Sequence, residues 1–238
     1  MIPAAVIATA TVSGIFGMGG GMILMGVYAL LLPVAAAMVL HGVTQLASNG
    51  FRAVLLRRHI YWPAFCWYAV GALASLAVFA WLAIRVDRAT LLIVLGGGPV
   101  LVAALPTPAW LRIEVPAVAV ACGAISTAAQ LVAGVSGPLL DIFFVKGKLD
   151  RYQVIGTKAV TQSLGHLIKI VYFGALLRVS TDLPVWIYPV AIGCAFAGTR
   201  IGTLLLARLT DVQFRRWSSR LIMAIGLVFA ARGVADLL

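Results

Sequence analysis

Apolar segments separated by short polar breaks run along the whole of this chain, and no other feature limits its fold so strongly. Of the 238 residues, 63% are hydrophobic and only 11% are charged, which is typical of an integral membrane protein and not of a soluble domain. Ten apolar segments stand out, at residues 2–16, 20–32, 34–56, 62–84, 88–105, 115–133, 138–146, 152–177, 184–207 and 215–235. The pattern predicts an all-α integral membrane protein that forms one membrane domain, with no separate soluble domain.

Basic residues outnumber acidic ones by 18 to 7, and most of them lie in short loops. The clusters are Arg57-Arg58-His59, Lys146/Lys148/Arg151 and Arg208/Arg215/Arg216/Arg220. Because cytoplasmic loops carry excess Lys and Arg, this charge indicates membrane topology and not nucleic-acid binding. Counting segments from these loops places both termini outside, with 85-RVDR-88 as the main exception. The first residues lack a basic region, so a cleaved signal peptide is not expected.

Two glycine clusters interrupt the apolar sequence. The first is Gly17 with Gly19–Gly21, and the second is Gly134 with Gly137. Glycine weakens a helix by about 1 kcal/mol relative to alanine, and each cluster precedes a segment shorter than the ~20 residues of a full helical span. Each half is therefore expected to contain one broken or short helix. The chain would have about eight membrane segments if these helices are re-entrant, and ten if they cross.

The sequence repeats itself at a constant offset of 117 residues. The matches are Gly17 with Gly134, Gly20 with Gly137, 43-VTQ-45 with 160-VTQ-162, Arg52 with Lys169 and Val54 with Val171. We predict an internal duplication, with a first repeat at residues 1–112 and a second at 113–238. Five segments in each half would give the halves opposite orientations, and inverted repeats with broken helices are typical of secondary transporters.

The glycine clusters are candidate anion sites. A helix that begins at Gly19, Gly20 and Gly21 would direct free N–H groups and a positive dipole end into the membrane. Ser136 and Gly137 would do the same in the second half, where Pro138 suits the first turn of a helix. The alternative is close helix packing by small residues.

A polar stripe follows the third segment of each half. At spacings of three and four, its members share one helical face. The stripes are His41, Gln45, Ser48, Asn49 and Arg52, and Lys158, Gln162, Gly165, His166 and Lys169. Neither stripe contains a carboxylate, so an anionic substrate is favoured over a metal cation. Arg52 lies near a helix end, and the alternative for it is a side chain that reaches the lipid headgroups.

Other polar residues in the apolar segments allow more than one role. Asp141 is a candidate for ion coupling, but we favour a structural ion pair with Lys146 or Lys158. His41 is a second ion-coupling candidate, although structural hydrogen bonding is favoured for both His41 and His166. Arg200 also lies in an apolar segment, with no assigned role, and the three cysteines are expected to be small apolar core residues. No enzyme motif, cofactor site or metal site is present in the pattern, so neither catalysis nor a cofactor is expected.

Several of these stretches resemble one family of permeases. The stretch 17-GMGGG-21 resembles the GxGGG signature of the TauE/SafE family of sulfite and organosulfonate permeases. The stretches 41-HGVTQLASNGFRAVLLRRHIYW-62, 156-GTKAVTQSLGHLIKIVYFG-174 and 193-GCAFAGTRIG-202 resemble later segments of the family, in the same order. The resemblance implies a bacterial cytoplasmic-membrane permease for small sulfur-containing anions such as sulfite or sulfoacetate. Two departures are GVSGP in the second repeat and His166 where related chains often carry Asn.

These observations together predict a multi-pass secondary transporter of the inner membrane that moves a small anion by alternating access between inverted halves. The expected partners are a sulfur oxyanion or organosulfonate and the lipid bilayer, without nucleic acid. The expected substrate-binding residues are Gly19, Gly20, Gly21, Gln45, Asn49, Arg52, Ser136, Gly137, Lys158, Gln162, His166 and Lys169. The alternative is a membrane scaffold or accessory subunit that transports nothing and uses the same small residues for helix packing.

Overall fold

The structure is a computed structural model that describes residues 2–16, 19–104, 107–178, 183–206 and 211–236. Its α-helices are α1 (Ile2–Phe16), α2 (Gly19–Leu31), α3 (Val34–Leu55), α4 (Trp62–Leu82), α5 (Arg88–Ala104), α6 (Pro116–Ala133), α7 (Gly137–Ile142), α8 (Arg151–Ile170), α9 (Ile187–Leu206) and α10 (Asp211–Ala235). A 3₁₀ turn (Arg57–His59) follows α3, and a π-helix (Val171–Leu176) extends α8. The described residues contain no strand, which confirms the predicted all-α fold.

Both short helices begin at the glycine clusters, as predicted. Helix α2 starts at Gly19 and has 13 residues, and α7 starts at Gly137 and has only six. Gly134 ends α6 with a φ of +76°, a left-handed conformation that glycine adopts without strain. Pro138 lies in the first turn of α7, where its missing N–H costs nothing. Gly17, the partner of Gly134 in the sequence repeat, lies outside the described residues.

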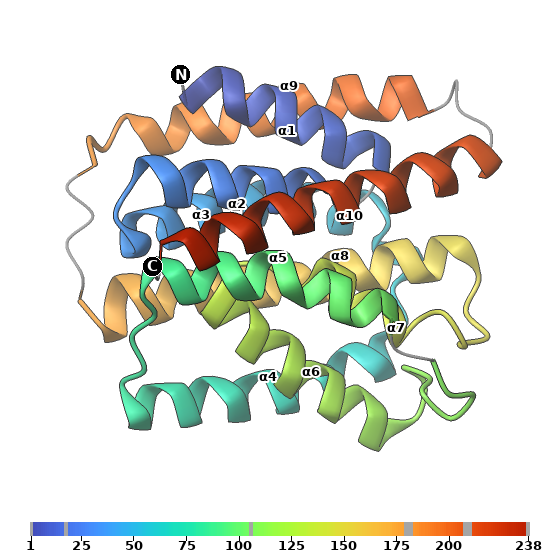
Figure 1. The fold of residues 1–238 in the computed structure, drawn as a ribbon. Helices are drawn as coiled ribbons and strands as arrows, with labels where there is room; N and C mark the ends of the chain where they lie inside the picture. Colours follow the sequence, from blue (N-terminus) through green and yellow to red (C-terminus); the bar gives the residue numbers. More distant parts are fainter. Residues whose placement is uncertain (1, 17–18, 105–106, 179–182, 207–210, 237–238) are drawn as a thin grey trace.

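The helices pack in pairs that join the two halves of the chain. Figure 1 shows α1 with α9 along one edge and α4 with α6 along the opposite edge. Between these edges, α3 packs against α8 and α5 packs against α10. Replacing each of the first five helices by its counterpart in the last five turns the α1–α9 pair into α6–α4 and leaves the two central pairs unchanged. Two equivalent halves would produce this pairing.

Glycine allows several of these helices to approach each other closely. Gly71 of α4 lies against the backbone of Val120 and Ala124 on α6, and Gly123 of α6 lies against the backbone of Tyr68 on α4. A side chain at either glycine would overlap the facing backbone. Contacts between small residues of this kind are a common means of helix association in membranes, where dispersion forces depend on close approach.

The outer surface of α4 is strongly apolar. Among the described residues, α4 and α6 are the two helices whose length and composition would allow them to cross a membrane. Large apolar side chains of α4 are exposed, including Trp67 at 45%, Leu73 at 55% and Trp81 at 83%. An apolar surface of this size suits lipid much better than water. Cys66 is also exposed on α4, so the expectation that all three cysteines lie in the core is wrong for this residue.

The connections at the two ends of the bundle differ in charge. The α3–α4 and α7–α8 connections, which contain two of the basic clusters, lie at the end opposite the α2–α3 turn (Figure 1). The Asp150 side chain caps the start of α8 by accepting from the N–H groups of Tyr152 and Gln153. At the α4–α5 connection, hydrogen bonds from the Thr90 hydroxyl and N–H lower the pKa of the Asp87 carboxyl.

The contact between α4 and α6 gives a direct test of the packing. We expect Gly71→Ala to lower the unfolding temperature in detergent by several degrees, because overpacking costs about 1–3 kcal/mol. The control is Gly97→Ala in α5, where an added Cβ would have no heavy atom within 4 Å. The control should unfold at or above the wild-type temperature, because alanine favours a helix. Equal unfolding temperatures for both variants would contradict the observed α4–α6 contact.

Candidate functional site

The two predicted polar stripes face each other across the contact between α3 and α8. His41, Ser48 and Asn49 of α3 are buried, as are His166 and Lys169 of α8. A Cβ at Gly42 would lie 2.7 Å from the Ile170 side chain and 3.3 Å from Lys169 Cε, so the glycine brings the two helices together. Sequence periodicity placed each stripe on one helical face, and the fold brings both faces to the centre of the bundle.

A cavity of about 20 Å³ lies between these stripes and the two helix breaks. Its lining includes eight of the predicted substrate-binding or ion-coupling residues: Gly21, His41, Gln45, Asn49, Ser136, Gly137, Gln162 and His166. The remaining lining residues are Ser13, Met22, Val135 and Pro138. The volume is enough for about one water molecule. An oxyanion could enter only if the surrounding helices moved apart.

Lys169 connects the two walls of this cavity without lining it. Its side chain is fully buried, and Nζ donates to Nδ1 of His41 at 2.8 Å and to the Gly134 carbonyl at 2.8 Å. Since His41 accepts at Nδ1, its proton is on Nε2, which donates to the Gly21 carbonyl at 2.9 Å. The chain of hydrogen bonds therefore joins α8, α3, α2 and the break after α6.

Gln130 holds the opposite wall in a similar way. Its amide nitrogen lies 2.7 Å from Nδ1 of His166, and its oxygen accepts from the Ser136 hydroxyl at 2.7 Å. The same amide nitrogen lies 3.4 Å from Nε2 of His166, so the nearer Nδ1 is assigned as the acceptor and Nε2 as the protonated nitrogen. The rings of His166 and His41 meet edge to face, with centroids 5.5 Å apart. Two neutral histidines are thus fixed side by side at the cavity.

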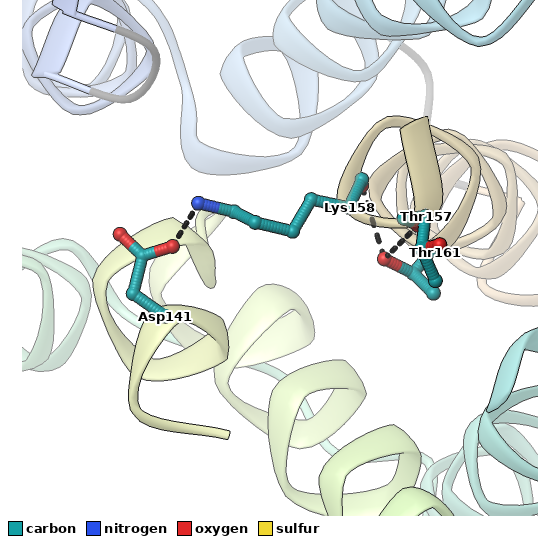
Figure 2. Close-up of polar contacts among 4 residues, drawn as sticks. All are labelled: Asp141, Thr157, Lys158 and Thr161. Carbon is teal, nitrogen blue, oxygen red and sulfur yellow. Dashed lines mark hydrogen bonds and ion pairs between the residues drawn. The ribbon is translucent and has the colours of Figure 1, made fainter. Parts of the chain in front are cut away.

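The other predicted site residues lie away from the cavity. Gly19 is buried at the start of α2, and Gly20 packs against the backbone of Thr9 and Ser13 on α1, so it serves close packing. Arg52 lies one helical turn beyond Asn49 and is partly exposed. Lys158 extends from α8 to form an ion pair with Asp141 of α7, as Figure 2 shows. The ion pair agrees with the role that was favoured for Asp141.

Neither Ser13 nor Gln130 was predicted as a site residue. Ser13 lines the cavity, and Gln130 bonds to the lining residues His166 and Ser136. The repeat contained a signal for both, because Gln130 is 117 residues after Ser13. Gln130 also lies one helical turn before Gly134 on α6. Neither residue belongs to the stripes or the glycine clusters. The position of Gln130 depends on the contact of α6 with α7 and α8, and that of Ser13 depends on the contact of α1 with α2.

The cavity is suited to an oxyanion by its hydrogen-bonding groups. Its lining has neutral amides, hydroxyls and imidazoles from both halves, and none of its residues is acidic. The buried ammonium of Lys169 lies behind His41, and no described carboxylate forms an ion pair with it. The described residues also contain no cluster of His, Cys, Asp and Glu that could hold a metal. Donors without a nearby negative charge favour an anion.

A second, apolar cavity of about 210 Å³ adjoins the first. It lies between α5, α6 and α7, and it shares Val135, Ser136 and Pro138 with the polar cavity. Its other walls include Leu95, Pro99 and Leu139, and it contains almost no polar surface. The break between α6 and α7 therefore separates a polar space from an apolar one.

Comparison with known proteins gives a match over nearly the whole chain. The profile of the family described as Sulfite exporter TauE/SafE matches residues 1–229 of the 238. The match covers both helix breaks, both polar stripes and all the cavity-lining residues. No curated protein and no solved structure matches the chain.

The bonds of Lys169 predict a large loss of stability when they are removed. Lys169→Met would leave the buried Gly134 carbonyl without its donor, at a cost of about 1–3 kcal/mol. We expect an unfolding temperature in detergent several degrees below that of the wild type. The control is Lys146→Met, which removes an exposed ammonium from the α7–α8 connection and should change the temperature little. Equal effects of the two substitutions would contradict the structural role of Lys169.

Proposed function

Because the chain belongs to the sulfite exporter TauE/SafE family, we propose that it carries a small sulfur oxyanion through the cavity between α3 and α8. Membership makes the chain a membrane transporter and not an enzyme. The single observation that supports the proposed site is the cavity lining, in which neutral hydrogen-bond donors from both halves meet without a carboxylate. Sulfite is the first candidate, because it is the smallest of the expected substrates and needs the least widening.

The neutral lining is also better suited to reversible binding of a transported anion than to tight binding. Amides of Gln45, Asn49 and Gln162 and the Nε2–H of His166 would donate to the oxygens of the anion, and the Lys169 ammonium would attract it from behind His41. A transported ion must bind well enough to enter and weakly enough to leave. Direct contact with several cations would hinder release.

Alternating access between two inverted halves is the proposed mechanism. The constant offset of 117 residues and the exchange of helix pairs between the halves support it. The small volume of the cavity also supports it, because a substrate would have to enter by separation of the α3 and α8 walls. The concentration of basic loops at one end of the bundle supports a multi-pass arrangement with that end in the cytoplasm of a bacterial inner membrane.

Flux measurements in proteoliposomes test the proposed site. We expect Gln162→Leu to reduce sulfite flux by about tenfold or more, because it replaces an amide donor of the cavity lining with an apolar side chain. The neighbouring control is Ser163→Ala, since the Ser163 hydroxyl bonds to the Ala159 carbonyl of its own helix. The control should retain wild-type flux. Full sulfite flux in Gln162→Leu would exclude this cavity as the route.

The apolar cavity next to the site supports an organosulfonate as a second candidate substrate. Its walls could accept the carbon portion of such an anion while the sulfonate occupies the polar cavity. Ala129 lines the apolar cavity, so Ala129→Leu should fill part of it. We expect this variant to reduce sulfoacetate flux several-fold and to leave sulfite flux close to wild type. Equal effects on both anions would contradict a role for the apolar cavity in substrate binding.

A further inference from the structure

Two pairs of basic residues lie at opposite sides of the cavity. On one side are His41, which lines the cavity, and Lys169, which lies one helical turn from the cavity residue His166. On the other side are Arg52 and Lys158, each one turn from Asn49 or Gln162. The offset of 117 residues converts one pair into the other, because His41 corresponds to Lys158 and Arg52 corresponds to Lys169.

The two pairs differ in their chemistry. Lys169 donates to His41 at 2.8 Å, because an imidazole nitrogen can accept a hydrogen bond. Arg52 and Lys158 have only donors, so they cannot bond to each other. Arg52 and Lys158 therefore need hydrogen-bond acceptors from other residues, and the Asp141 carboxylate is the acceptor for Lys158. In the first half, the residue that corresponds to Asp141 is Leu24, which has no acceptor in its side chain. None is needed there, because His41 accepts the hydrogen bond from Lys169.

The pairs also differ in access to solvent. His41 and Lys169 are fully buried. The side chain of Lys158 is 18% exposed and that of Asp141 is 22% exposed, and Arg52 is partly exposed. The second pair is therefore accessible from outside the bundle without passage through the cavity.

The charges around Lys158 are not balanced. Asp141 is the only acidic residue in the sequence between Glu114 and Asp150. Arg52 forms no ion pair within the described residues. It lies close to Lys158, because the two residues fall between two contacts of the packed segments, Gly50 with Ser163 and Leu56 with Gly156. Two cations and one carboxylate leave a net positive charge beside the cavity. A partly buried cation in a membrane protein is costly unless an anion accompanies it.

We propose that Arg52 and Lys158 form a second anion site in series with the cavity, and that Asp141 occupies it until the transported oxyanion displaces its carboxylate from Lys158. The inference rests on the proposed function, because it assigns these residues to the path of the same substrate. Figure 2 shows the Lys158 side chain extended from α8 across to Asp141, and the displacement would leave its ammonium free to bind the oxyanion. Asp141 then competes with the substrate instead of only neutralising a buried charge.

The test measures the apparent KM for sulfite flux in proteoliposomes, with the unfolding temperature of each variant as a check on folding. Removing the competitor in Asp141→Asn should lower KM by about three- to tenfold, because the site becomes available in a larger fraction of molecules. The control is Asp236→Asn, which removes the same charge after α10, where Asp236 pairs with Arg88 and Arg232. The control should keep the wild-type KM.

A double substitution separates a substrate ligand from a structural ion pair. Lys158→Gln should raise KM by about tenfold or more, and adding Asp141→Asn should not restore it. A wild-type KM in the double variant would overturn the proposal, because the two residues would then matter only to each other. An unchanged or higher KM in well-folded Asp141→Asn would overturn it as well.

Arg52→Gln keeps the test decisive if variants of Asp141 do not fold. It leaves the Asp141–Lys158 pair intact, and its KM for sulfite should rise several-fold while its unfolding temperature stays near that of the wild type. An unchanged KM would overturn the second site. Absence of any anion flux in the wild-type protein would overturn the proposed function itself, which is a different result from normal flux with unchanged KM values.

Discussion

The central site depends on the hydrogen bonds of one buried ammonium group, that of Lys169. An amine at this depth must have acceptors, and it finds them in His41 and in the carbonyl of Gly134. The bond to Nδ1 of His41 fixes the tautomer of this imidazole, whose Nε2 in turn donates to the Gly21 carbonyl. The Lys169 side chain is therefore linked by hydrogen bonds to both helix breaks, directly at Gly134 and through His41 at Gly21.

Much of this architecture could be predicted because its signals are local. Apolar segments and glycine clusters located the helices, and the starts of α2 and α7 at Gly19 and Gly137 agree closely with the expected breaks. Helical periodicity also identified the buried stripes. The repeat pairs Gln130 with Ser13, but the bonding partners of Gln130 and the packing role of Gly20 could not be predicted, because they depend on which helix lies opposite. A glycine that exposes its N–H and a glycine that admits a neighbouring backbone look the same in a sequence.

Neutral groups line the cavity, while the cations lie about one helical turn away on either side. The separation follows from helix geometry, because Arg52 and Lys169 are three residues from Asn49 and His166 on the same faces. Cations at this distance attract an anion without holding it in direct contact. The arrangement is compatible with both recognition and release of an anion, whereas a carboxylate in the lining would repel the anion and oppose its binding.

An anion in the cavity would affect the buried contacts of Lys169 with His41 and Gly134. His41 forms part of the wall and also accepts the bond from Lys169, so an anion beside His41 would attract the same ammonium. The anion would compete with the Gly134 carbonyl, which is one of the contacts that hold the α6 break against α8. A ligand changes a conformational equilibrium only through unequal affinity for the two states. In the proposed mechanism, competition for the Lys169 ammonium would give the substrate such a preference for the state in which the Lys169 side of the cavity is open. Competition with the Asp141 carboxylate for Lys158 would have the equivalent effect on the opposite side.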